Sequence, residues 1–347
     1  MTRLSIARIA TDTPMGAQAY QAQIISRAPA ALGADWRVRE LVFRSLRSPL
    51  PGNRRLPISR IASAPASVRR AFGRMLFTGD AVSHRMSLEL PPSPHADVIT
   101  LHDVVAWRFA DESAPVPEAI EEARRAAAVI CVSEFTAREA VEFLGVEDPH
   151  VVPNGVDPRY YDAVPLDSAA AASLGLPGRY VLHAGGAAER KNLAALASAW
   201  PLVHRERPDL TLALAGPPHP RRTALFEGMP GTVMLGRLPD ETMPGLVAAA
   251  SVVVVPSLYE GFGLPALEAM AAGVPVVAAN TSSLPEVVGD AGILIPPTAE
   301  GIADGLLHAT SADAALSALV AAGRTRAAEF TWERSAAGHA AIWKALR

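Results

Sequence analysis

The order of apolar and polar positions divides the chain into short apolar runs that alternate with helical patterns. The clearest run is Val252–Val255, which is too short for a typical helix and too apolar for an edge strand. A helical pattern covers residues 266–272, with Pro265 at its expected first position and Gly273 as its stop. This segment therefore predicts a buried parallel strand, a loop, a helix and a second strand at 276–278.

The remainder of the second half repeats this alternation. Further strands are expected at 180–182, 210–214, 232–235 and 292–295. Strands that alternate with helices are typical of a doubly wound parallel sheet. The loops at the carboxyl ends of such strands form the usual ligand side of the sheet.

The first half carries weaker but similar signals. Its expected strands lie at 4–9, 97–101, 129–132 and 151–152, and a turn at 13–20 leads into a helix through Ile24 and Ile25. Residues 158–178 are rich in alanine, proline, aspartate and glycine, which is typical of a linker. We therefore predict a first domain at 1–177, a second at 178–330 and a C-terminal helix at 331–347.

The loop between Val255 and Pro265 suits an anionic ligand. Gly261 and Gly263 carry no side chains, and free amides at the start of the next helix point to the same place, which favours a phosphate. A carboxylate is repelled by a phosphate, so Glu260 and Glu268 are expected to accept hydrogen bonds from sugar hydroxyls on either side of it. Together these groups predict a nucleotide-sugar site.

A second loop supplies positive charge. The segment HAGGAAERKNL, residues 183–193, carries adjacent Arg190 and Lys191 on a loop that contains glycine. Arginine can bind two phosphate oxygens at once and lysine acts as a point charge, so the pair suits a diphosphate. An ion pair with Glu189 is the alternative structural interpretation.

The segment SLYEGFGLPALEAMAAGVPVV, residues 257–277, resembles the donor-binding signature of the family-4 retaining glycosyltransferases of the GT-B fold. The residues RKN, the HD of His102 and Asp103, and PNGVD at 153–157 are similar to other motifs of that family. A departure is Gly186, where many members have another arginine, so one phosphate contact is absent or supplied elsewhere.

The resemblance implies two Rossmann-like α/β domains that face a central cleft, with the C-terminal helix crossing back to the first domain. It implies that Glu268 holds the ribose hydroxyls, that Glu260 holds the transferred sugar and that His102 lies beside that sugar. The implied catalytic residues are His102, Arg190, Lys191 and Glu260, and the implied donor-binding residues are Gly16, Gly185, Asn192, Arg237, Leu238, Gly261, Phe262, Gly263, Leu264 and Glu268.

Composition limits the other possibilities. The net charge of −3 gives no reason to expect nucleic acid as a partner. The N-terminus lacks the apolar core of a signal peptide, and no run approaches the roughly 18 apolar residues of a membrane span, so a cytoplasmic protein is expected. Cys131 lies in an apolar run and is expected to be a buried thiol. No Cys/His cluster has metal-ligand spacing, and no metal or other cofactor is expected.

The one strongly basic region runs from Arg37 to Arg85, where only Glu40 and Asp80 oppose its arginines. One interpretation is a surface for an anionic acceptor or for the inner face of the plasma membrane. The other is a solvated arginine face.

The sequence therefore predicts a retaining, metal-independent hexosyltransferase that uses a nucleotide-diphosphate sugar, with GDP-mannose favoured over UDP- and dTDP-sugars. Its acceptor would be a saccharide or a lipid-linked glycan. A glycosidase would leave Arg190 and Lys191 without a purpose, and no G-x-G-x-x-G turn supports a nicotinamide dehydrogenase. A catalytically silent GT-B binding module stays open, as do the oligomeric state and the linkage formed.

Overall fold

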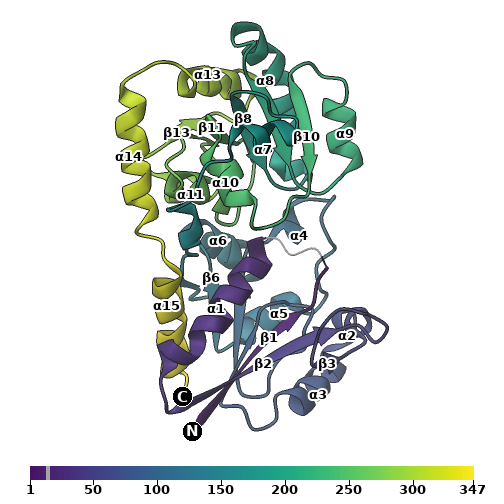
Figure 1. Ribbon diagram of the computed structural model, residues 1–347. Coiled ribbons are helices and arrows are strands. Elements are labelled where there is room, and N and C mark those ends of the chain that lie inside the picture. Colours follow the sequence, from purple (N-terminus) through teal and green to yellow (C-terminus); the bar gives the residue numbers. More distant parts are fainter. Residues whose placement is uncertain (13–15) are drawn as a thin grey trace. The chain divides into compact units, whose positions relative to one another are not determined.

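The computed structural model describes residues 1–12 and 16–347, so residues 13–15 of the predicted first turn lie outside the described residues. The chain forms two compact units. Unit 1 contains residues 1–155 and 331–347, and unit 2 contains residues 156–330. Each unit is built on its own parallel sheet (Figure 1).

Unit 1 contains a sheet of seven described strands in the order β3-β2-β1-β4-β5-β6-β7. The strands are β1 Thr2–Ile9, β2 Trp36–Arg44, β3 Arg54–Arg55, β4 Val82–Arg85, β5 Ala96–Leu101, β6 Ala128–Cys131 and β7 His150–Val151. Every neighbouring pair is parallel. The order reverses between β1 and β4, which is the switch point of a doubly wound fold.

Helices connect these strands. They are α1 Gly16–Leu32, α2 Ile58–Ala62, α3 Ala66–Leu76, α4 Val105–Arg108, α5 Ala119–Arg125, α6 Glu134–Glu139 with a π-helical continuation at Ala140–Leu144, and α15 Trp332–Ala345. Helix α15 packs beside α1 although the two are separated by most of the chain (Figure 1). The Oγ1 atom of Thr331 caps α15 by accepting from the amide of Arg334.

The arginines of the predicted basic region do not all face solvent. Arg69 and Arg85 are fully buried, and both bind Glu122; Arg85 also binds Asp97 at 2.7 Å. Glu40 and Asp80 are the acidic residues within this region, but carboxylates from a later strand and a later helix pair with its two buried arginines. Cys131 is a buried free thiol, as predicted.

Unit 2 contains a sheet of six strands in the order β10-β9-β8-β11-β12-β13. The strands are β8 Tyr180–Ala184, β9 Thr211–Ala215, β10 Thr232–Gly236, β11 Val252–Val255, β12 Val276–Ala279 and β13 Ile293–Ile295. All pairs are parallel, which confirms the predicted doubly wound sheet. The four valines of β11 are buried because the strand lies inside the sheet, between β8 and β12.

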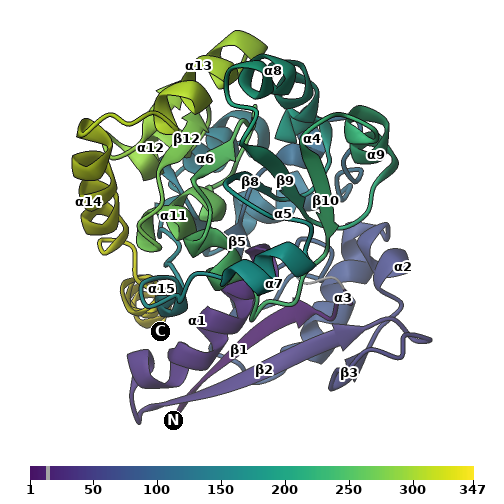
Figure 2. The ribbon, with the colours of Figure 1, turned by 45° about the horizontal axis from the view of Figure 1, so that its top comes forward.

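The elements that connect and follow these strands are 3₁₀-helices and α-helices. They are the 3₁₀-helices Pro158–Tyr160 and Glu189–Lys191, α7 Ser168–Ser173, α8 Leu193–Glu206, α9 Pro220–Phe226, α10 Met243–Ala248, α11 Leu264–Ala271, α12 Leu284–Val288, α13 Ala299–Ala309 and α14 Ala315–Ala327. Helices α8 and α13 lie side by side (Figure 2) and cover a core that includes Trp200 and Val254. Helix α14 packs against α11.

The division between the units differs from the predicted boundary at 177. Residues 156–177 belong to unit 2, because the amide of Leu166 donates to the carbonyl of Gly245 and Tyr160 bonds to Glu268. The alanine- and proline-rich composition of this segment suggested a linker, but the segment packs on the second sheet.

Candidate active site

The predicted phosphate loop follows β8 and ends at α8. Its 3₁₀-helix Glu189–Lys191 leads into Asn192, which adopts the left-handed conformation with φ 55°. The Asn192 Nδ2 donates to the carbonyl oxygens of Pro256 at 3.0 Å and Pro297 at 2.9 Å. The loop after β8 is thereby fixed to the loop that follows β11.

A buried ion pair joins these two loops. The Nζ of Lys191 lies 2.6 Å from Oε1 of Glu260, and the Nη1 of Arg190 lies 3.5 Å from Oε2 of the same carboxylate. The hydroxyl of Ser257 donates to Oε1 at 2.7 Å. Burial alone would raise the pKa of Glu260, but the charges of Lys191 and Arg190 outweigh it and lower that pKa. Glu260 is therefore a carboxylate at neutral pH.

Two serines fix the backbone of the Glu260 loop. The Oγ of Ser282 accepts from the amide of Glu260 at 3.0 Å. The buried hydroxyl of Ser283 is shared between the carbonyl oxygens of Glu260 and Phe262, both at 2.9 Å. Both serines lie one strand further along the chain, after β12, and their role here is structural.

Gly263 begins the helix that the sequence predicted. It caps α11 with φ 105°, a value that favours glycine. Pro265 is the second residue of the helix, because α11 begins at Leu264, so its predicted first position is wrong by one residue. The amide of Ala266 already donates to the carbonyl of Gly263. Within the described residues, the amides of Gly263 and Leu264 donate to no acceptor.

Glu268 has different surroundings from Glu260. It lies in α11, where the hydroxyl of Tyr160 donates to its carboxyl group and Asp157 is close by. Burial, aided by the charge of Asp157, raises the pKa of Glu268 to about 8, although the Tyr160 hydrogen bond opposes the change. Glu268 therefore holds its proton to a higher pH than an exposed carboxyl group does. Tyr160 carried no signal in the sequence analysis.

His183 is a buried histidine beside the phosphate loop. It is 2% exposed, and its Nδ1 has no hydrogen-bond partner among the described residues. Burial, together with the charges of Arg222 and Lys191, lowers its pKa to about 3. The imidazole is therefore neutral, and His183 is not among the predicted site residues.

The other predicted donor-binding residues of unit 2 occupy more than one place. Phe262 is buried against Phe330, with ring centroids 5.7 Å apart, and Gly261 is buried beside it. Arg237 and Leu238 follow β10, which β9 and β8 separate from β11. Three strand spacings of about 4.8 Å put this segment roughly 14 Å from the Glu260 loop across the sheet.

The predicted residues of unit 1 are His102 and Gly16. His102 follows β5, and its ring contacts the edge of Tyr20 with centroids 4.6 Å apart. Gly16 is the exposed first residue of α1, the helix that carries Tyr20. The Tyr20 hydroxyl bonds to Thr100 and to His339 of α15 at 2.6 Å. Burial and His339 lower the pKa of His102 to about 4, so its imidazole is neutral.

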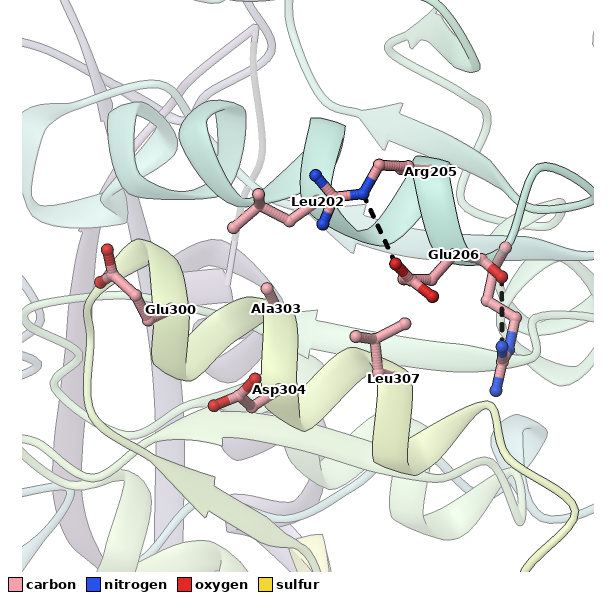
Figure 3. A pocket seen from close by; sticks show the side chains of 8 residues that line it. Leu202, Arg205, Glu206, Glu300, Ala303, Asp304 and Leu307 are labelled. Carbon is pink, nitrogen blue, oxygen red and sulfur yellow. Dashed lines mark hydrogen bonds and ion pairs between the residues drawn. The ribbon is translucent and has the colours of Figure 1, made fainter.

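Unit 2 also has a groove that contains none of the predicted site residues. It has a volume of about 410 Å³ and lies between α8 and α13. Figure 3 shows Leu202 and Leu307 between the charged side chains of Arg205 and Glu206 on one helix and Glu300 and Asp304 on the other. These residues lie on helices that cover the sheet, whereas the predicted site lies on the loops after the strands.

The described residues offer neither a cluster of metal ligands nor a helix that could span a membrane. They contain no group of three or more His, Cys, Asp and Glu side chains arranged to hold a metal ion. None of their helices combines the length and the apolar character needed to span a membrane.

Family models match both halves of the chain. A model described as Glycosyltransferase Family 4 matches residues 80–160, and one described as Glycosyl transferases group 1 matches residues 178–311. These matches confirm the predicted resemblance of the chain to mannosyltransferase-like glycosyltransferases of family 4.

Several curated relatives are mannosyltransferases by name. The chain is 39% identical over 171 residues to O-antigen chain mannosyltransferase B of Escherichia coli, covering 44% of this chain and 42% of the relative. It is 32% identical over 234 residues to the MMP alpha-(1->4)-mannosyltransferase of Mycolicibacterium hassiacum, covering 64% and 55%. The chain thus spans about half the length of these relatives.

Solved structures share the fold. The sucrose-phosphate synthase of Thermosynechococcus elongatus matches with a TM-score of 0.79 at 22% identity, covering 100% of this chain and 99% of that one. HepE of Anabaena in complex with UDP and glucose matches with a TM-score of 0.75 at 20% identity, covering 99% and 100%. These matches confirm the predicted GT-B fold class.

Proposed function

Because the chain is a family-4 glycosyltransferase by sequence and fold, we propose that it transfers a hexose from a nucleotide-diphosphate sugar to a hydroxyl group of a glycan acceptor. The observation that carries this proposal is the buried pair of Lys191 and Glu260 with Arg190 beside it, set on the loops after β8 and β11. These loops offer cations and a carboxylate next to the open amides of Gly263 and Leu264. A diphosphate and the hydroxyls of a sugar are the groups that this combination suits.

In the proposed reaction the bond between the anomeric carbon and the diphosphate oxygen breaks. Arg190, Lys191 and the start of α11 stabilise the negative charge that collects on the leaving diphosphate, without a metal ion. The acceptor oxygen attacks the same face of the sugar, so the configuration is retained. Its proton passes to the departing phosphate, while Glu260 and His102 orient the sugar.

Mannose is the proposed sugar. The relatives named above are mannosyltransferases, and the sequence motifs around His102 and Lys191 favour GDP-mannose as the donor. A UDP-sugar is the second candidate, because HepE, a solved structure of the same fold, holds UDP and glucose. The acceptor is proposed to be a saccharide or a lipid-linked glycan in the biosynthesis of a surface polysaccharide or glycoconjugate.

Two measurements test this function. GDP-, UDP- and dTDP-sugars are screened for an increase in melting temperature, since a ligand that binds only the folded state raises it. The donor that does so is then incubated with candidate acceptors in the presence of EDTA, and release of nucleoside diphosphate is measured. Failure of all three donor classes to bind would refute the proposal. Binding without any release would favour the silent binding module.

We also propose that helix α3 contacts an anionic membrane. Its exposed side includes Arg70 and Arg74, which make no ion pair among the described residues, and the apolar Val68 and Met75, which are 41% and 62% exposed. Basic and apolar side chains on one short helix suit the surface of an anionic bilayer. Unlike the buried Arg69 and Arg85, these arginines are exposed, and both line a pocket that also contains Glu118 and Glu121.

Sedimentation with vesicles tests the membrane contact. Vesicles that contain an anionic lipid should bind the wild type, and reversing Arg70 and Arg74 to glutamate should abolish that binding at about 0.1 M salt. In the matched control, Arg205 and Arg207 of unit 2 are replaced by glutamate, which changes the net charge by the same amount. Equal loss in both variants would show that only net charge matters and would refute a role for α3.

A further inference from the structure

Arg222 is a buried cation without an acidic partner. It lies in α9, is 3% exposed, and has no carboxylate within ion-pair distance among the described residues. The other deeply buried arginines, Arg69 and Arg85, both pair with carboxylates. Burying an unpaired charge costs free energy, so the presence of this buried arginine indicates that its charge has a function.

The three hydrogen-bond acceptors of Arg222 among the described residues are carbonyl oxygens at the phosphate loop or next to it. Its Nη1 donates to Pro217 at 2.7 Å, and its Nη2 donates to Gly185 at 2.6 Å and to Gly186 at 3.1 Å. The Nε is buried and has no partner among the described residues. Arg222 therefore holds the carbonyl groups of the two glycines on its own side of the loop.

This arrangement determines where the amides of the loop point. The described chain has no cis peptide bond, and in a trans peptide the C=O and the N–H point in opposite directions. With the carbonyls of Gly185 and Gly186 turned toward Arg222, the amides of Gly186 and Ala187 point away from it. Neither amide has a partner among the described residues. Two adjacent open amides form an anion-binding concavity.

Gly216 makes the approach of Arg222 possible. A Cβ atom at this position would lie 2.0 Å from the carbonyl oxygen of Gly185 and 2.9 Å from Nη2 of Arg222. Any side chain here would displace the backbone of the loop. The loop also adjoins the ion pair described above, because a Cβ on Gly185 would lie 3.9 Å from Cε of Lys191.

We propose that Arg222 is a positioning residue for the diphosphate of the donor: it turns the amides of Gly186 and Ala187 toward the ligand and adds a third cation to Arg190 and Lys191. This inference rests on the proposed function. It also accounts for the phosphate contact left unassigned at Gly186 in the sequence, because the amides of Gly186 and Ala187 would supply that contact. Arg222 acts from behind the loop, so it need not touch the phosphate itself.

The test compares binding of GDP, UDP and inorganic pyrophosphate by calorimetry to four proteins. They are the wild type, Arg222→Met, Lys191→Ala and the control Arg207→Met. Arg207 lies at the far end of α8, which at about 1.5 Å per residue is roughly 20 Å from Asn192. Arg222→Met should raise the Kd of the bound nucleotide and of pyrophosphate at least tenfold, which is about 1.4 kcal/mol. The control should bind as the wild type does.

If Arg222 has only a structural role, Arg222→Met will have a lower melting temperature, but its folded fraction will bind with an unchanged Kd. That result would overturn the inference. If Arg222→Met does not fold, Arg222→Lys decides the question. Lysine keeps the charge but lacks the fork that binds two carbonyls, so its Kd should rise at least threefold. An unchanged Kd would again overturn the inference. If the wild type itself binds no nucleotide or pyrophosphate, both the proposed function and this inference are refuted. If Lys191→Ala loses binding while Arg222→Met binds as the wild type does, only the role of Arg222 is refuted.

Discussion

Replacing Lys191 by alanine tests the centre of the candidate site. In the folded protein its Nζ lies 2.6 Å from Oε1 of Glu260, and the side chains are 11% and 9% exposed. The substitution leaves Glu260 buried, with Ser257 at 2.7 Å and Arg190 at 3.5 Å as its remaining partners. We expect the variant to lose both stability and turnover, for separate reasons.

The two losses have different sizes. Removing one partner of a buried ion pair typically costs 3–5 kcal/mol, and because Arg190 still faces the carboxylate we expect about 3 kcal/mol in the free energy of unfolding. The loss of one cation from the leaving phosphate should reduce kcat by at least about a hundredfold. The pKa of Glu260 should rise, since Lys191 is the strongest of the charges that lower it.

A second substitution separates these effects. Glu260→Gln in the Lys191→Ala background removes the unpaired charge, so stability to urea should recover by about 2 kcal/mol or more while turnover stays low. Lys344→Ala is the matched control. It removes the only other lysine of the chain, an exposed residue of α15 whose Nζ donates to the carbonyl of Ala31. Near-normal turnover in Lys191→Ala would refute the assignment of the leaving-group site.

The remaining predictions concern α11. The carboxyl of Glu268 has a pKa of about 8 in the folded protein and about 4.5 in the unfolded chain, so the folded state binds the extra proton between these values. The contribution of this group to the free energy of unfolding is largest below pH 4.5. It falls as the pH rises to 8, by up to about 1.4 kcal/mol per pH unit. Urea unfolding of Glu268→Gln, which cannot titrate, should lack this slope, and identical pH profiles would contradict the shift. Gly263→Ala should destabilise the protein by about 1–3 kcal/mol through its positive φ, and by more where the new Cβ meets Leu284 at 2.8 Å. Gly228→Ala, also at positive φ but with nothing within 4 Å, controls for backbone strain, and an equal loss in both would contradict the contact.

The strands of unit 2 could be predicted because each combines short length with full burial. A parallel strand covered on both faces has few polar positions, so Val252–Val255 carries its own signal without reference to any distant residue. The start of α11 could be predicted from a similarly local signal, since Gly263 and Pro265 mark a helix start within three residues. The one-residue error at Pro265 falls within the usual uncertainty of helix ends.

The site was only partly predictable because much of it is assembled from distant segments. Arg190, Lys191 and Glu260 belong to recognisable motifs, but Arg222 and Tyr160 lie outside every motif. What gives Arg222 its place is the parallel order of β8 and β9, which brings the start of α9 beside the loop after β8. No short-range pattern encodes such a contact. The same reasoning applies to residues 156–177, whose composition suggests a linker although Leu166 is bonded to Gly245.

The arginines of unit 1 show why local charge counts mislead. Between Arg37 and Arg85 the sequence offers few carboxylates, yet Arg85 reaches Asp97 on the neighbouring strand β5 and shares Glu122 of α5 with Arg69. A parallel sheet pairs strands that are separated by a crossover connection, so the counter-charges of one strand lie later in the sequence. An arginine-rich segment can therefore be partly a buried ion-pair network and partly a surface. Only its exposed members, such as Arg70 and Arg74, can contribute to binding an anionic partner, and the vesicle experiment has to target those residues.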